Sequence, residues 1–219
     1  MIEIINLDKT PSLISRFMRE LRDTTIQNDP LRFRRNLERI GEIMAYEVSK
    51  RLEYHDEEVE TPLAKVMVKE PSEKIVLATI LRAGLPFHHG FLNYFDHAEN
   101  AFVSAYRKYK EKGDKFDVLV EYLASPDIDG KTLIIVDPML ATGSSMELGY
   151  RALLNNGNPA KIHVASVIAS QQAIDYVAEV MPKDKTTIWT AAIDPEINSH
   201  SYIVPGLGDA GDLAFGEKL

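Results

Sequence analysis

Residues 134–145 place one acidic side chain between an apolar stretch and a run of small and hydroxyl residues. The segment reads Ile-Ile-Val-Asp-Pro-Met-Leu-Ala-Thr-Gly-Ser-Ser, and Asp137 is its only charged residue. Thr132 to Val136 are strand-compatible and mostly apolar, which is typical of a strand covered on both faces in a parallel sheet. The segment therefore predicts a phosphate-binding strand, loop and helix, with Asp137 at the carboxyl edge where ligands of open α/β sheets collect.

The loop from Ala141 to Ser145 has side chains small enough for main-chain N–H groups to converge on an anion. A helix beginning near Ser144 would add its positive end, and Thr142, Ser144 and Ser145 would add hydroxyl donors. A simpler alternative is an ordinary strand-to-helix turn in which Ser144 or Ser145 caps the helix. The serines alone favour that alternative.

Two better-known motifs do not fit this loop. A Walker A loop requires G-x-x-x-x-G-K-[ST], but the next lysine after Gly143 is Lys161. The nucleophile elbow of hydrolases, G-x-S-x-G, is matched at Gly143 and Ser145 and then broken by Glu147. Since that elbow needs a small residue for helix and strand to approach closely, a serine hydrolase is disfavoured.

A glycine-rich segment lies near the C-terminus. Gly206 to Gly211 reads G-x-G-x-x-G, the pattern of dinucleotide sites, but such a site needs a helix, a strand and an acid about 20 residues further on. Eight residues follow Gly211, so a dinucleotide site is not expected. The glycines, with Asp209 and Asp212 among them, instead suit a loop whose main-chain groups contact a flat heterocycle.

Four segments together resemble the type I phosphoribosyltransferases, and among them the uracil-specific members. Most of that family has two adjacent acids before the phosphate loop, whereas here Val136 stands in the first place and only Asp137 remains. The single-acid form is similar to the uracil-specific members, and the order and spacing of the segments agree with it. The segments are residues 134–145, Ile80–Leu85, Tyr106–Arg107 and Tyr202–Asp212.

The resemblance implies transfer of ribose 5-phosphate from phosphoribosyl pyrophosphate (PRPP) to uracil, giving uridine monophosphate (UMP) and diphosphate in pyrimidine salvage. It implies catalytic roles for Asp137, Asp209 and Arg107, with the two arginines Arg82 and Arg107 binding pyrophosphate. Uracil would contact Ile203, Gly208, Asp209 and Ala210. The PRPP-binding set would be Arg82, Arg107, Asp137, Pro138, Met139, Leu140, Ala141, Thr142, Gly143, Ser144, Ser145 and Asp209.

The resemblance also implies partners. Mg²⁺ would bind mainly through PRPP oxygens and water, since this chain lacks the usual acid pair and Mg²⁺ keeps few protein ligands. GTP is a candidate allosteric activator, and a homo-oligomer, a dimer or larger, is expected. One departure stands at Ser144, where the family usually has a second glycine. If Ser144 needed a positive φ, that would cost roughly 1 kcal/mol.

The composition restricts the class of protein. A net charge of −8, from 25 Lys plus Arg and 33 Asp plus Glu, argues against general nucleic-acid binding. No apolar stretch approaches the roughly 20 residues of a membrane span, and Met1 to Thr10 lacks the basic-then-apolar order of a signal peptide, so we expect a cytoplasmic protein without a membrane partner. The absence of cysteine and of any H-E-x-x-H spacing predicts no protein metal site. The 219 residues suit a single domain, residues 1–219.

The pattern of elements predicts an α/β fold, a mostly parallel sheet flanked by helices, with N-terminal helices. The resemblance implies a flexible hairpin arm as well. Asp29-Pro30 begins an amphipathic helix, and Pro11 to Gln27 is expected to be helical. Glu111 to Asp114 predicts the hairpin turn, and the acids from Glu53 to Glu60 are assigned to a solvated helix end or loop. Strands are expected at 74–80, 101–106, 116–122, 133–136, 162–168 and 187–193, and further helices at 86–94, 145–155 and 171–181.

Two alternatives remain open. A nucleotide-sensing regulator could keep this fold without turnover, and Ser144 is the feature that favours it. Retention of Arg82, Arg107, Asp137 and Asp209 together weighs against it. A transferase for hypoxanthine or adenine would usually carry the acid pair, so Val136 in its first place favours uracil as the base.

Overall fold

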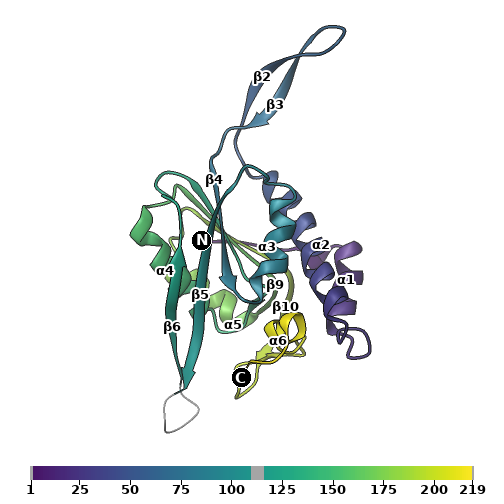
Figure 1. The fold of residues 1–219 in the computed structure, drawn as a ribbon, viewed down its shortest axis with the longest axis vertical. Coiled ribbons are helices and arrows are strands. Elements are labelled where there is room, and N and C mark those ends of the chain that lie inside the picture. The colour runs from purple at the N-terminus through teal and green to yellow at the C-terminus, as the bar shows by residue number, and fades with distance from the viewer. Residues whose placement is uncertain (1, 110–115, 219) are drawn as a thin grey trace.

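The computed structural model describes residues 2–109 and 116–218, with the backbone alone for 105–109 and 116–120. At its centre is a sheet whose neighbours are parallel, apart from one antiparallel pair at an edge (Figure 1). The sheet contains β1 (Glu3–Asn6), β4 (Ile75–Leu81), β5 (Glu99–Tyr109), β6 (Phe116–Ala124), β7 (Thr132–Val136), β8 (Met139–Leu140), β9 (Lys161–Ser170) and β10 (Thr186–Asp194).

The strand order is β1-β10-β9-β7-β4-β5-β6, and β8 adds a short parallel pairing to β9. The expected mostly parallel sheet is thereby confirmed, including each of the six strands predicted from apolar runs. β5 and β6 pair antiparallel, as expected of a hairpin. The turn expected at Glu111 to Asp114 lies outside the described residues.

Helices cover both faces of the sheet and bury two separate apolar cores (Figure 1). One core lies under α1 to α3 and the C-terminal α6, and the other lies under α4 and α5. No helix of the described ranges is long and apolar enough to cross a bilayer. The helices are α1 (Leu13–Arg22), α2 (Pro30–Ser49), α3 (Gly84–Leu92), α4 (Ser144–Leu153), α5 (Gln171–Val180) and α6 (Ala210–Phe215), with 3-10 turns η1 (Leu7–Lys9) and η2 (Leu154–Asn156).

The two N-terminal helices begin at capped positions. The Asp29 carboxylate accepts hydrogen bonds from the N–H groups of Leu31 and Arg32, and Pro30 occupies the first turn of α2, as the sequence predicted. Ser12 caps α1 and exchanges a second hydrogen bond with Ser15. α1 is shorter than the helix expected over Pro11 to Gln27, because the chain turns at Asp23, whose carboxylate accepts the N–H of Thr25.

An exposed hairpin projects from the rest of the molecule (Figure 1). It is formed by β2 (Tyr54–Glu60) and β3 (Lys65–Pro71), which pair antiparallel. The assignment of Glu53 to Glu60 to a helix end or loop was therefore wrong for most of that segment, although its exposure was correctly predicted. A second small pairing joins β11 (Glu196–Ile197) to β12 (Ile203–Val204) near the C-terminus.

Candidate active site

The carboxyl ends of the parallel strands bring the predicted site residues to one edge of the sheet. Thr79 of β4 pairs with Val136 of β7, so Arg82 and Asp137 follow neighbouring strands at nearly the same level. The Asp137 N–H donates to the carbonyl of Ala165 on β9, at 3.1 Å. This edge is where ligands of open α/β sheets bind.

The loop between β7 and α4 turns at Gly143 rather than at a serine. Gly143 is the N-cap of α4 with a φ of 82°, and as a glycine it makes no side-chain cap bond. The alternative in which Ser144 or Ser145 caps the helix is therefore wrong. In the described part of the chain Ser201 is the one non-glycine residue with a positive φ, so Ser144 carries no such strain. Ser144 is the first helical residue, and Thr142 Oγ1 lies 3.2 Å from its hydroxyl.

The first half of the phosphate loop is braced by β9. Met139 and Leu140 pair with Ile168 and Ala169. Ser170 then donates its hydroxyl to the carbonyl of Ala141 at 2.6 Å and caps α5 with the same oxygen. The loop therefore approaches the helix N-terminus from a fixed direction, which suits an anion site built from main-chain N–H groups.

Arg82 connects the end of β4 to the C-terminal segment. Its Nη2 lies 3.2 Å from Asp212 Oδ1 and 3.3 Å from the carbonyl of Gly216, while the side chain remains partly exposed. A half-exposed guanidinium beside one carboxylate can still present donors to a phosphate. Arg107 belongs to β5, which continues past the level at which Leu81 pairs with Ser104. The side chain of Arg107 lies outside the described residues.

The C-terminal segment folds against the same edge. Ile203 is buried on β12, whereas Gly208 is exposed and has a φ of 89°. Asp209 caps α6 by accepting the N–H groups of Gly211 and Asp212 at 2.8 and 3.0 Å, and Ala210 is buried as the first residue of that helix. Asp209 thus has a structural role that the sequence did not indicate.

Three residues at this edge were not predicted as part of the site. Asp194 ends β10 and pairs with Arg22 of α1, and Asp212 pairs with Arg82. One signal for Asp194 was present, since Asp194-Pro195 follows a strand in the same way as Asp137-Pro138. Arg22 carried no local signal, because its partner lies 172 residues further along the chain.

Burial by itself would raise the pKa of Asp194. Hydrogen bonds from the Arg22 guanidinium and the Gly206 N–H outweigh that effect and hold its pKa below the usual range. This carboxylate is therefore ionised at neutral pH.

The acids near the edge fit a magnesium ion held mainly by a substrate. Among the described residues no three His, Asp or Glu side chains gather as a metal cage. Asp209 and Asp212 are engaged by a helix N-terminus and by Arg82. Since Mg²⁺ usually keeps several waters and takes one or two carboxylates together with phosphate oxygens, such a partly engaged set is compatible with it.

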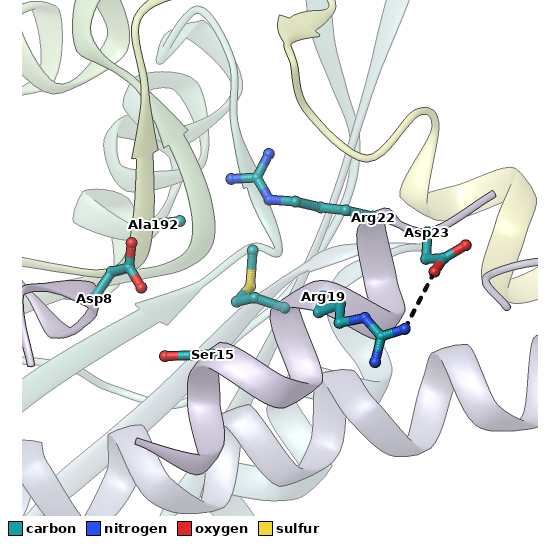
Figure 2. Close-up of a pocket in the computed structure, with 7 residues that line it drawn as sticks. Asp8, Ser15, Arg19, Arg22, Asp23 and Ala192 are labelled. Atoms are coloured by element: carbon teal, nitrogen blue, oxygen red, sulfur yellow. Dashed lines mark ion pairs between the residues drawn. The ribbon is translucent and has the colours of Figure 1, made fainter. Parts of the chain in front are cut away.

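A hollow of about 500 Å³ lies beside α1, next to the end of β10 (Figure 2). Arg22 extends across it, and an ion pair between Arg19 and Asp23 closes one side. The hollow is lined by Asp8, Ser15, Met18, Arg19, Arg22, Asp23 and Ala192. None of these is a predicted substrate contact.

Comparison with known proteins agrees with this arrangement. The sequence profile of uracil phosphoribosyltransferases matches residues 9–217. The chain is similar to a uracil phosphoribosyltransferase of Porphyromonas gingivalis, 67% identical over 218 residues that cover 100% of both chains. One of Methanothermobacter thermautotrophicus is 42% identical over 86% of this chain and 85% of that one. A solved structure from Aquifex aeolicus has a TM-score of 0.86 and 29% identity, covering 97% of this chain and 98% of that one.

Proposed function

The chain belongs to the uracil phosphoribosyltransferase family, and from that premise we propose which of its residues carry the reaction. It is a pentosyltransferase that converts uracil and PRPP to UMP and diphosphate in pyrimidine salvage. The observation that supports the site most strongly is the convergence of the phosphate loop, Arg82 and the C-terminal segment on one sheet edge. We assign the whole chain, residues 1–219, to this one catalytic domain.

The phosphate loop holds the 5-phosphate of PRPP. Residues 138–145 form this loop, in which the residues after Pro138 supply main-chain N–H groups. Helix α4 adds the positive end of its dipole. Asp137 accepts hydrogen bonds from the ribose hydroxyls and favours the positive charge that develops on the sugar as pyrophosphate leaves. Arg82 and Arg107 bind the departing pyrophosphate with forked donors.

The base lies against the C-terminal segment. Ile203 supplies an apolar contact, and Gly208 to Ala210 read the edge of uracil largely through main-chain groups. Asp209 faces the ribosyl substrate while its Oδ1 caps α6. A fixed backbone at this point would distinguish the donors and acceptors of one pyrimidine from those of another.

Mg²⁺ accompanies PRPP, neutralises pyrophosphate charge and is bound mainly through substrate oxygens and water. GTP is a candidate activator, to be tested by adding it to the assay. We assign the enzyme to the cytoplasm, as expected for an enzyme that uses the phosphorylated metabolite PRPP.

We also propose that the enzyme is a homo-oligomer, supported by the hairpin of β2 and β3. A lone two-stranded ribbon is marginally stable in water, and this one exposes Leu63 at its tip to 96% and Met67 to 58%. Such side chains favour burial against a second copy. Light scattering should give a mass at least twice that of one chain, whereas a monomer at micromolar concentration would refute this part of the proposal.

The alternative of a nucleotide sensor without turnover has lost the feature that favoured it. Ser144 lies in ordinary helical conformation and does not strain the loop. Formation of UMP from uracil, PRPP and Mg²⁺ tests the function directly, with hypoxanthine, adenine and orotate in parallel and GTP present or absent. UMP formation with uracil alone is expected. Binding of PRPP without any product would instead favour the nucleotide sensor.

The capping role of Asp209 allows its chemical role to be tested separately. Asn caps helices as well as Asp, so Asp209→Asn should keep α6 and the free energy of unfolding within about 0.5 kcal/mol. We expect its kcat to fall by about tenfold or more, because the charge facing the ribosyl group is lost. Turnover at the wild-type rate would remove Asp209 from the catalytic set, and Asp209→Ala gives the cost of losing the cap as well.

A further inference from the structure

We propose that Arg22 and Asp194 are positioning residues for base recognition, because their ion pair fixes the main chain that leads into the uracil-reading segment. The inference rests on the proposed base site at Gly208 to Ala210. Neither residue touches the base itself. They act through the peptide groups of Gly206.

The segment before the base site is not held by a sheet or a helix. β12 ends at Val204 and α6 begins at Ala210, so the five residues between them need another support. Gly206 has a φ of 65°, and a Cβ there would lie 2.0 Å from the carbonyl oxygen of Ile203. The chain therefore turns back tightly on β12. Recognition by main-chain groups requires such a turn to be held within a fraction of an ångström.

The ion pair binds both polar groups of Gly206. Arg22 makes two hydrogen bonds of 2.7 Å to the two carboxylate oxygens of Asp194. Asp194 Oδ2 accepts the Gly206 N–H at 2.8 Å, and Arg22 Nη1 donates to the Gly206 carbonyl at 3.0 Å. One planar pair thus fixes the position and the orientation of a residue two places before Gly208.

The next residue is held from the same direction. Gln27 follows α1, and its Nε2 donates to the carbonyl of Leu21 at 2.7 Å and to that of Leu207 at 3.0 Å. Two successive carbonyls of the loop are therefore bound by side chains from the N-terminal region. Figure 2 shows that Arg22 points away from the neighbouring pair of Arg19 and Asp23, so it does not belong to that surface ion pair.

Stability by itself is a weak reason for this arrangement. The side chain of Asp194 is 7% exposed and that of Arg22 is 26% exposed, so both groups lose much of their hydration. A buried ion pair of this kind is often no more stabilising than apolar residues of similar volume. The forked pair instead fixes the orientation of the loop, because its bidentate geometry and its two bonds to Gly206 are satisfied together in one arrangement of the Gly206 peptide groups.

Steady-state kinetics of Arg22→Lys test the proposal. Lysine keeps the charge but has no planar fork, so the bidentate pair with Asp194 that aligns the bond to the Gly206 carbonyl is lost. We expect the KM for uracil to rise about tenfold, equivalent to about 1.4 kcal/mol. The KM for PRPP and kcat should stay within about twofold, since base binding is lost equally in the ground and transition states. Discrimination between uracil and cytosine should fall as well.

Arg32→Lys is the matched control. Arg32 of α2 makes two hydrogen bonds of 2.9 Å to Glu20 of α1, a carboxylate as buried as Asp194. This pair has the same chemistry. Among the described residues, its hydrogen bonds reach no residue of the C-terminal segment. Its loss should lower stability without changing the KM for uracil.

The outcomes separate this inference from the proposed function. Absence of UMP formation by the wild-type enzyme would refute the function itself. If the wild type is active and Arg22→Lys keeps the wild-type KM for uracil, or if Arg32→Lys raises that KM equally, the positioning role is overturned. Should Arg22→Lys fail to fold, Gln27→Leu serves instead. It removes the bond to Leu207 and should raise the KM for uracil in the same direction, and an unchanged KM would count against the proposal.

Discussion

Gly143 is the residue of the phosphate loop with the least room for change. Its φ of 82° disfavours any side chain by about 1 kcal/mol. A Cβ there would lie 2.8 Å from Tyr176 Cδ1 and 3.0 Å from Val177 Cγ2, so these side chains of α5 would have to shift. We expect Gly143→Ala to lower the melting temperature and to weaken PRPP binding, measured by calorimetric titration.

Ser144→Gly is the natural comparison, because it restores the residue that the family usually has. Ser144 is already helical, so glycine there should lower stability by a few tenths of a kcal/mol and leave PRPP binding nearly unchanged. If Ser144→Gly instead strengthened PRPP binding severalfold, the positive φ at Gly143 would not be the conformational determinant of the loop.

The residues of the candidate site were predictable where the chemistry is local in sequence. Asp137, the phosphate loop and the glycine-rich C-terminal segment each carry their signal in a few consecutive residues. Asp194 and Arg22 do not, since their role depends on a contact across most of the chain. Asp209 shows the converse, because its motif indicated substrate contact while the structure adds a helix cap.

At the scale of elements, a salt bridge network anchors the exposed hairpin. Glu53 and Glu73 flank the hairpin, and Lys161 of β9 binds them at 2.8 and 2.6 Å. Burial alone would raise the pKa of Glu73, but hydrogen bonds from Lys161, Thr132 and the Glu53 N–H hold it below the usual range. The network lies at the amino ends of the strands, opposite the candidate site.

Lys161→Met should therefore loosen the hairpin without affecting catalysis. We expect the free energy of unfolding to fall by about 1–3 kcal/mol, because the buried Glu73 carboxylate loses a charged donor. Hydrogen exchange should increase in residues 54–71, while the KM for both substrates stays unchanged. Lys69→Met is the control, since its partner Asp56 is exposed and such pairs contribute about 0–1 kcal/mol. Unchanged exchange in Lys161→Met would contradict the anchoring role.

The same hairpin shows where sequence patterns stop predicting elements. The strands of the main sheet are apolar runs covered on both faces, and such runs are recognisable. β2 and β3 are exposed on nearly every residue, so neither an apolar run nor an alternation marks them. α6 was missed for another reason, because it has six residues and begins inside a glycine-rich motif.

At the scale of the whole molecule, the packing of helices on both faces of the sheet buries two histidine side chains, His88 and His163. Burial lowers the pKa of His163 on β9 to about 4. Burial, and then the neighbouring His89, lowers the pKa of His88 on α3 to about 4. In the unfolded chain a histidine titrates near 6.5. Unfolding therefore takes up protons between about pH 6.5 and 4, and stability falls as the pH drops through that window.

The contribution of His163 to this pH dependence can be measured separately. Its Nδ1 accepts a hydrogen bond at 3.1 Å from Trp189, the single tryptophan of the chain. Protonation would turn the accepting Nδ1 into a donor and set two donors against each other. His163→Gln keeps an acceptor for the indole but cannot titrate. We expect it to remove about 1.4 kcal/mol per pH unit from the dependence of unfolding free energy on pH below 6.5. Denaturant melts followed by Trp189 fluorescence at pH 7, 6 and 5 measure this slope. His97→Gln is the control, because the His97 side chain is fully exposed. If the unfolding free energy of both variants depended on pH as it does in the wild type, another group would govern acid unfolding.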